Sequence, residues 1–174
     1  MTDDRPRGIE HVGITVPDHD AAIHFFKEAF GAEPLFSLTT RDGDPMRARE
    51  LAPKNGLAQG TAIVAVTMLR LGNGANLEVF EIDHPTSRRS SGIADQGISH
   101  FSLTVDDIDA TTARFVAAGG ALLEGPYDLT GQEAGPGNRG RFGLTPWGLL
   151  IEFESLSSAT TSDTGTDTQR WLPD

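Results

Sequence analysis

The sequence contains no cysteine, and this absence removes several kinds of chemistry at once. Without thiols the chain forms no disulfide bond, builds no thiolate zinc site and offers no cysteine nucleophile. Any metal ion must therefore be held by His, Asp or Glu side chains.

Basic residues are also scarce, since 14 Lys and Arg stand against 25 Asp and Glu, for a formal net charge of −11. Binding to the phosphate backbone of nucleic acid needs clustered basic residues, so no such partner is expected. Long apolar runs are missing, and the opening MTDDRPRG lacks the hydrophobic segment of a secretory signal. We therefore expect a cytoplasmic protein with no membrane partner.

What the sequence does contain is an internal repeat. Residues 9–32 match the stretch 89 positions later at eleven of 24 positions, without a gap. A second match, between GANLE at 74–78 and GLLIE at 148–152, has a shift of 74. The smaller shift indicates an insertion of 15 residues in the first copy, within residues 39–60. Repeats at a fixed spacing reflect repeated architecture, so we predict two copies of one supersecondary unit.

Each copy is expected to begin with a strand and a helix. The β-branched runs IEHVGITV and ISHFSLTV predict the strands. Asp18 is the expected cap of the first helix, and Asp106 or Asp107 that of the second. Three β-like segments follow in each copy, AEPLFSL, TAIVAVTMLRLG and ANLEVFEI in the first and ALLEGP, GRFGLT and LLIEFES in the second.

The sequence thus predicts an α+β fold of two βαβββ modules with antiparallel sheet. The first module spans residues 8–83 and the second spans 97–155, joined by a linker at 84–96. Residues 1–7 are expected to be flexible. Residues 156–174 are rich in Ser, Thr and Asp and are expected to form a disordered tail.

Four polar residues recur at matched places in the two copies. His11 and His100 lie in the first strands and share a face with small residues, because neighbouring side chains of a strand alternate between faces. Glu78 and Glu152 lie in the last strands, where their side chains point to the face opposite to that of their apolar neighbours. Two imidazoles and two carboxylates suit a divalent metal and leave one or two positions for water or substrate. Any one of these residues, taken alone, is more simply explained as a solvated residue of a strand. Duplication of the module also explains part of the match between the copies. The occurrence of all four together nevertheless favours a metal site.

Four segments, HVGITVPDHDAAIHFF, NLEVFE, HFSLTVDDIDA and TPWGLLIEFE, resemble the vicinal oxygen chelate superfamily, the glyoxalase/bleomycin-resistance/dioxygenase group. The resemblance covers roughly residues 8 to 155. It implies two modules whose sheets form a cupped, incomplete β-barrel around one metal ion, which would be Zn, Ni, Co, Mn or Fe. Related proteins complete the cup within one chain or by exchanging modules in a dimer, and a homodimer is expected here. The implied ligands, from the first and last strand of each module, are His11, Glu78, His100 and Glu152.

A complete set of four resembles glyoxalase I and, more loosely, methylmalonyl-CoA epimerase. The resemblance implies a metal-dependent lyase or isomerase that forms a metal-bound enediolate from a small carbonyl-containing substrate. Glu152 is the first candidate for the catalytic base and Glu78 the second. Two alternatives stay open, an Fe(II)-dependent ring-cleaving or other oxygenase and a non-catalytic small-molecule-binding or antibiotic-resistance protein.

Further candidates are residues that could contact a substrate. Aromatic residues could form an apolar wall, although aromatic side chains in strands more often belong to the core. Arginines could bind a substrate carboxylate, although exposed arginine is the commoner case. The candidates are Phe80, Phe101, Phe142, Trp147, Arg47 and Arg141.

Overall fold

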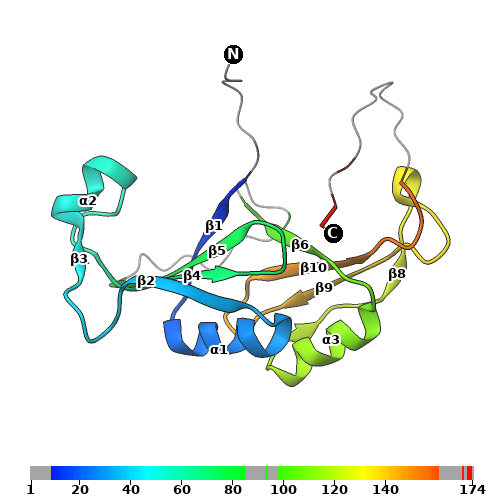
Figure 1. The fold of residues 1–174 in the computed structure, drawn as a ribbon, viewed down its shortest axis with the longest axis horizontal. Helices are drawn as coiled ribbons and strands as arrows, with labels where there is room; N and C mark the ends of the chain where they lie inside the picture. The colour runs from blue at the N-terminus through cyan, green and yellow to red at the C-terminus, as the bar shows by residue number, and fades with distance from the viewer. Residues whose placement is uncertain (1–8, 85–92, 94–97, 161–169, 171, 174) are drawn as a thin grey trace, which may run out of the picture. The chain divides into compact units, whose positions relative to one another are not determined.

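The computed structural model describes residues 9–84, 93, 98–160, 170 and 172–173 (Figure 1). The chain divides into two compact units, one of residues 1–27 and 31–85 and one of residues 28–30 and 86–174. The expected flexible start at 1–7, and most of the expected linker and tail, lie outside the described residues. The module boundaries stay predictions.

The first unit holds a five-stranded sheet in the order β1-β5-β4-β2, with the short strand β3 also paired to β4 (Figure 1). A helix, α1, connects β1 to β2. A second helix, α2, follows β3 within the insertion. The elements are β1 (His11–Thr15), α1 (His19–Phe30), β2 (Glu33–Thr39), β3 (Met46–Arg47), α2 (Ala48–Asn55), β4 (Ala62–Arg70) and β5 (Asn76–Asp83).

The second unit repeats this plan, with a five-stranded sheet in the order β6-β10-β9-β7 and the short strand β8 also paired to β9. Its helix α3 connects β6 to β7, and a single 3₁₀ turn, η1, takes the place of the longer insertion. The elements are β6 (His100–Thr104), α3 (Ile108–Ala117), β7 (Ala121–Leu122), β8 (Tyr127–Asp128), η1 (Gly131–Glu133), β9 (Arg139–Leu144) and β10 (Leu150–Ser155).

These two units confirm the α+β class, and both sheets are open along the described residues. The expectation of antiparallel sheet is wrong for one pairing in each unit, because β1 runs parallel to β5 and β6 runs parallel to β10. A parallel pair needs a long crossover connection, and each of these pairs joins the first strand of a unit to its last. The remaining pairings are antiparallel.

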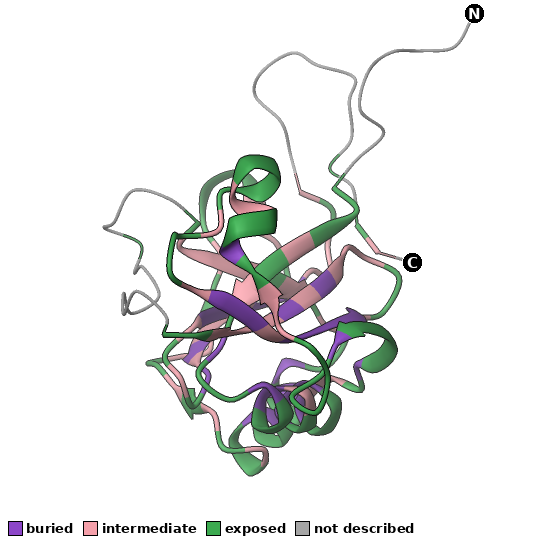
Figure 2. Cartoon of the chain, turned by 90° about the vertical axis from the view of Figure 1, so that its left-hand side faces the viewer, coloured by how far each residue is buried: buried purple, intermediate pink, exposed green. Residues whose placement is uncertain are grey.

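The two long helices begin at the expected caps and bury one face each. Asp18 accepts a hydrogen bond from Ala21 N at 3.0 Å, and this bond holds the pKa of the Asp18 carboxyl below its usual value. Asp107 caps α3 by accepting from Ala110 N at 2.9 Å. Strands and inward helix faces carry most of the buried residues (Figure 2). The fully buried phenylalanines include Phe26 of α1 and its counterpart in the repeat, Phe115 of α3.

Replacing Asp107 by Ala is expected to lower the free energy of unfolding by about 0.5–2 kcal/mol, because the Ala110 amide loses its acceptor. Urea denaturation followed by circular dichroism measures this loss. Asp106→Ala is the matched control, since Asp107 is the residue that caps the helix, and it should change stability far less. An equal loss in both variants would contradict the capping role.

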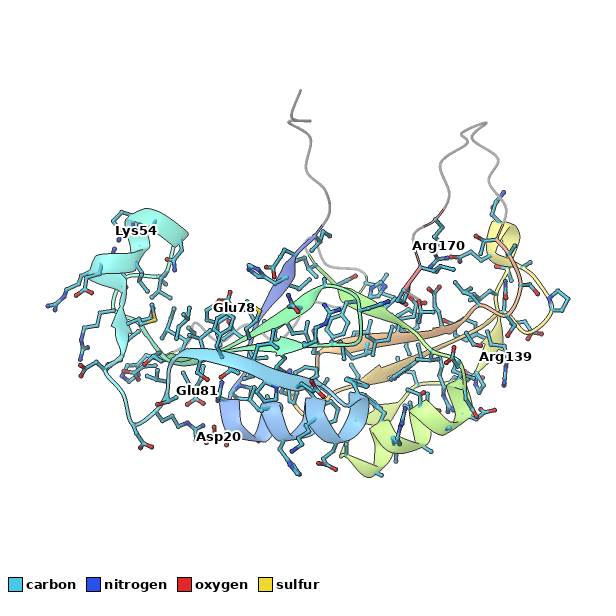
Figure 3. All side chains as sticks on the ribbon, viewed as in Figure 1. Asp20, Lys54, Glu78, Glu81, Arg139 and Arg170 are labelled. Carbon is cyan, nitrogen blue, oxygen red and sulfur yellow. The ribbon has the colours of Figure 1, made fainter. Side chains whose placement is uncertain are left out.

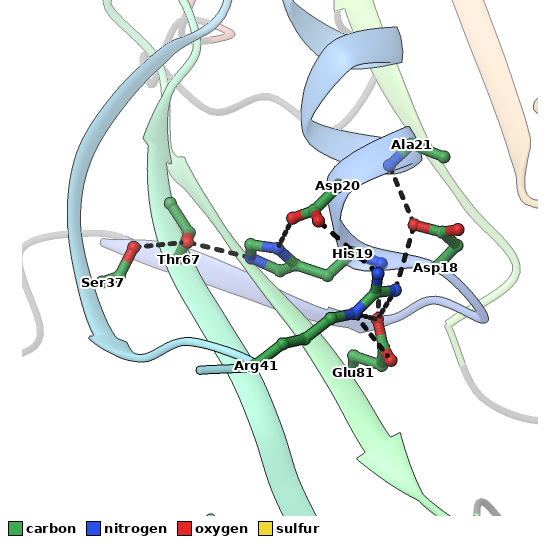
Figure 4. A network of polar contacts seen from close by, with 8 residues as sticks. All are labelled: Asp18, His19, Asp20, Ala21, Ser37, Arg41, Thr67 and Glu81. Carbon is green, nitrogen blue, oxygen red and sulfur yellow. Dashed lines mark hydrogen bonds and ion pairs between the residues drawn. The ribbon is translucent and has the colours of Figure 1, made fainter. Parts of the chain in front are cut away.

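A cluster of polar side chains connects the start of α1 to the sheet by hydrogen bonds and ion pairs (Figure 4). The Arg41 guanidinium donates to both oxygens of Glu81, at 2.6 Å for the shortest contact, and lies 3.1 Å from Asp18 and 3.5 Å from Asp20. These carboxylates raise the pKa of Arg41 further, with the Glu81 hydrogen bonds as the first cause. The loop after β2 is therefore tied to both α1 and β5.

His19 is the buried member of the same cluster (Figure 4). Its backbone N donates to Glu81 Oε2 at 2.7 Å. Its ring lies between Thr67, with Nε2 2.9 Å from Oγ1, and Asp20, with Nδ1 3.1 Å from Oδ1. Ser37 extends the chain of hydroxyls, 2.7 Å from Thr67. Every polar atom of the buried imidazole thus has a partner, as buried polar groups require.

The described part of the chain contains no helix that is both long enough and apolar enough to span a bilayer.

Candidate metal centre

The parallel pairing of β1 with β5 brings His11 and Glu78 together. Gly13 lies opposite Glu78 in the register, so His11, two residues earlier on the same face, is beside it. His11 Nε2 is 3.5 Å from Glu78 Oε2. Glu78 and Glu81 leave β5 on opposite sides, so the pair lies on the sheet face away from the His19 cluster (Figure 3). The Glu78 side chain is 18% exposed and is accessible without being fully solvated.

The second unit builds the same pair from β6 and β10. Ser102 lies opposite Glu152, which reproduces the two-residue offset of the first unit. His100 Nε2 is 3.4 Å from Glu152 Oε2, and the Glu152 side chain is 16% exposed. The two units therefore present His–Glu pairs of the same register and nearly the same separation.

These pairs suit a divalent metal by donor type and by spacing. Nitrogen and oxygen ligands bind zinc-like ions at about 2.0–2.2 Å, which places two neighbouring tetrahedral ligands about 3.4 Å apart. The observed separations of 3.5 and 3.4 Å fall at this spacing. Within the described ranges, no three His, Asp or Glu side chains group as a metal site. What each unit presents is one His–Glu pair.

The residue before His11 contacts the other side of its ring. Glu10 Oε2 is 2.6 Å from His11 Nδ1, and Glu10 Oε1 accepts from Asn76 Nδ2 at 2.7 Å. The hydrogen bond to His11, followed by that from Asn76, lowers the pKa of the Glu10 carboxyl. An ionised Glu10 therefore faces His11 on the side away from Glu78.

His100 has different neighbours. Ser99 Oγ is 2.8 Å from His100 Nδ1, and the Phe142 ring meets the imidazole edge to face with centroids 5.3 Å apart. Phe142 also lies opposite Glu152 in the β9–β10 register. Two of the expected residues, Phe142 and Glu152, thus flank His100.

The electrostatic surroundings of Glu152 favour its protonated form. Burial is the first cause that raises the pKa of the Glu152 carboxyl, and the negative charge of Glu154 adds to it. Glu154 is buried and accepts from Arg170 at 2.6 Å, while Arg170 also contacts Glu133 at 2.5 Å. Glu152 therefore releases its proton at a higher pH than an ordinary glutamate.

The other expected substrate contacts divide between the two faces. Phe80 shares the face of Glu78 and lies over Gly13, where an added Cβ would be 3.3 Å from its ring. Phe101 and Arg141 alternate onto the opposite face of their sheet, where Arg141 donates to Leu123 O at 3.3 Å. Trp147 lies in the turn between β9 and β10, and Arg47 is exposed at the end of β3. Phe101 and Arg141 therefore lie on the face opposite to the second His–Glu pair. The roles of Trp147 and Arg47 as substrate contacts stay predictions.

Sequence reasoning missed Glu10, Ser99, Glu154 and Arg170. A signal existed for Glu154, because Glu152 and Glu154 are two apart in LLIEFES and must share a face. No pattern pointed to Arg170, which follows a stretch of low apolar content.

Comparison of the sequence with known proteins shows the family. Residues 8–153 match the family model of the Glyoxalase/Bleomycin resistance protein/Dioxygenase superfamily. The chain is 31% identical over 167 residues to a 2-epi-5-epi-valiolone epimerase from Actinomyces sp., covering 95% of this chain and 88% of that protein.

Solved structures agree on the fold. A glyoxalase family protein from Bacillus cereus superposes with a TM-score of 0.68 at 19% identity, over 89% of this chain and 97% of that one. A fosfomycin resistance protein from Listeria monocytogenes gives a TM-score of 0.57 at 15% identity, over 87% and 94%. The chain belongs to the Glyoxalase/Bleomycin resistance protein/Dioxygenase superfamily.

Proposed function

We propose that this protein is a divalent-metal-dependent epimerase that inverts a carbon next to the carbonyl group of a small substrate. The observation that carries the proposal is the recurrence of a His–Glu pair in both units, at 3.5 and 3.4 Å, in a chain whose relative is named an epimerase. That relative acts on 2-epi-5-epi-valiolone, a ketone by its name, so we propose a related hydroxylated ketone as substrate.

The proposed ligands of one metal ion are His11, Glu78, His100 and Glu152. A bound divalent ion would supply Lewis-acid polarisation of the substrate carbonyl, which makes the neighbouring C–H bond more acidic. His11 and His100 would hold the ion through Nε2. The two carboxylates have a second use, since epimerisation needs a group that removes a proton and a group that returns one to the other face.

Glu152 is the proposed base that removes the proton. Its raised pKa is closer to neutral pH than that of an ordinary glutamate, and a general base works best when its pKa is near the operating pH. Glu78 is the proposed partner that returns the proton. The Phe142 ring beside His100 provides an apolar surface at the same place and limits access of water.

The metal content of the purified chain tests this proposal. Protein isolated without chelator and loaded separately with Zn, Ni, Co, Mn or Fe(II) is expected to hold about one equivalent per chain of its preferred ion, because four donors form one site. The double variant His11→Ala/His100→Ala should lose this ion. Plasma emission spectrometry gives the stoichiometry, and light scattering of the same samples tests the expected homodimer.

The reaction class is tested with the metal-loaded protein and 2-epi-5-epi-valiolone in D₂O. Epimerisation through an enediolate predicts deuterium at the inverted carbon. Oxygen uptake with Fe(II), without deuterium exchange, would replace the proposal by the oxygenase alternative. Failure to bind any of the five ions would contradict the metalloenzyme proposal and favour a binding or resistance protein.

A further inference from the structure

We propose that Glu10 is a positioning residue that holds His11 in the tautomer able to bind a metal ion, which makes the two His–Glu pairs inequivalent. The inference rests on the proposed metal-dependent function and deepens it. It assigns the anchoring of the metal to the first pair, His11 and Glu78.

The argument starts from the hydrogen-bonding capacity of a carboxylate. An ionised carboxylate only accepts, so the 2.6 Å contact between Glu10 Oε2 and His11 Nδ1 requires the proton to be on Nδ1. In the neutral ring the other nitrogen, Nε2, then carries a lone pair. Nε2 is the atom that faces Glu78 at 3.5 Å, so the lone pair points to the proposed metal position.

Asn76 fixes Glu10 in turn. Its Nδ2 donates to Glu10 Oε1 at 2.7 Å, and its backbone N donates to Glu10 O at 2.9 Å. The two carboxylate oxygens of Glu10 are thereby divided between Asn76 and His11. The hydrogen bonds thus run from Asn76 of β5 through Glu10 to the imidazole of His11, whose free nitrogen is Nε2.

The second pair lacks this arrangement. Ser99 occupies the place of Glu10, and its hydroxyl can either donate to or accept from His100 Nδ1 at 2.8 Å. The place of Asn76, opposite the histidine in the register, is taken by Leu150. Neither residue dictates the tautomer of His100. Of the two histidines, only His11 is therefore held in the tautomer that a metal ligand needs.

A partner on the distal nitrogen of a metal-bound histidine orients the ring and raises its basicity, and its loss typically costs about 10–100-fold in metal affinity. We therefore expect Glu10→Ala to weaken Zn²⁺ binding by about this factor. Ser99→Ala, the matched change in the second unit, should weaken it less. Asn76→Leu, which copies Leu150, should fall between the two.

Nitrogen NMR of the ¹⁵N-labelled, metal-free chain tests the tautomer directly. At about pH 9, where an ordinary histidine is neutral, the His11 signals of the parent should show a proton on Nδ1 and none on Nε2. In Glu10→Ala the proton should move to Nε2, where Glu78 can accept it. The side chain of Glu10 is 71% exposed, so this variant leaves the core intact.

Zn²⁺ affinity, from competition with a chromophoric chelator, is the second readout. A proton on Nε2 in the parent, or equal losses of affinity in Glu10→Ala and Ser99→Ala, would overturn the inference. A parent that binds no Zn²⁺ would contradict the proposed function, while the NMR result would still decide whether Glu10 sets the tautomer of His11.

Discussion

Glu152→Gln is expected to lower kcat for epimerisation by about 10²–10⁴-fold, the usual contribution of general acid–base catalysis. Glutamine has nearly the same shape, and its amide oxygen still reaches the proposed metal position, but it takes up no proton. Deuterium incorporation into 2-epi-5-epi-valiolone measures the loss, and metal content measured on the same sample separates catalysis from ligation. The variant should keep its ion.

Glu78→Gln is the matched comparison, because Glu78 has the same register and nearly the same exposure as Glu152. If Glu152 removes the proton, only Glu152→Gln should abolish exchange of the substrate hydrogen with solvent. Loss of exchange in Glu78→Gln alone would transfer the role of base to Glu78.

The free energy of unfolding of metal-free Glu152→Gln provides a control, because the direction of its change relative to the parent can be predicted. Because the folded-state pKa of Glu152 is raised, ionisation of this residue opposes folding, and its contribution to stability is lost as pH rises through that pKa. The variant, which has no such titration, should be at least as stable as the parent at neutral pH. The difference should shrink on acidification below the ordinary Glu pKa of about 4.3. A strongly destabilised variant would mean that lost activity reflects unfolding.

Phe115→Ala is expected to lower the free energy of unfolding by about 3–5 kcal/mol, as for other fully buried phenylalanines. The ring packs edge to face on Phe153, with centroids 5.1 Å apart. It also occupies space left by two glycines. An added Cβ at Gly143 would be 2.7 Å from the ring, and one at Gly120 would collide with it. Chemical denaturation of the metal-free chain measures the loss.

Gly120→Ala provides the independent check on this packing. On its own it should destabilise by about 1–3 kcal/mol, the usual cost of overpacking. Combined with Phe115→Leu, which shortens the ring, it should cost less than the sum of the two single changes, because the colliding atoms are gone. Strict additivity would contradict the proposed contact.

Repetition was the strongest guide that the sequence offered. Alternation along a strand placed His11 and Glu78 on predictable faces, and the same spacing in the second copy predicted that His100 and Glu152 would follow. The structure brings each pair together because the two units share one strand register. How the pairs combine is a property of tertiary arrangement that strand periodicity does not encode.

The misses have local physical reasons. β1 begins at His11, so Glu10 lies just before the strand, where alternation no longer says which way a side chain turns. The buried apolar residues of α1 are Ala22, Phe25, Phe26 and Ala29, a set that helical spacing alone does not separate from their apolar neighbours. Short elements such as β3 and β8, two residues each, carry too few residues for a pattern.

Identical residues at matched positions of the repeat can also have different structural roles. Gly31 and Gly120 align in the two copies, yet Gly31 ends α1 with φ at 67° and has open space around it, whereas Gly120 makes room for Phe115. A left-handed backbone favours glycine at the first position, and close packing requires it at the second. The match in sequence alone could not separate these two causes.

The two parallel ladders would connect the proposed metal ion to the edges of both sheets. Within the described residues, β1 and β6 are edge strands, paired to β5 and β10 respectively. Each His–Glu pair spans that single ladder, so an ion held there would cross-link the first strand of a unit to its last. Chelation would then leave backbone amides at two sheet edges open to exchange and to pairing with other chains.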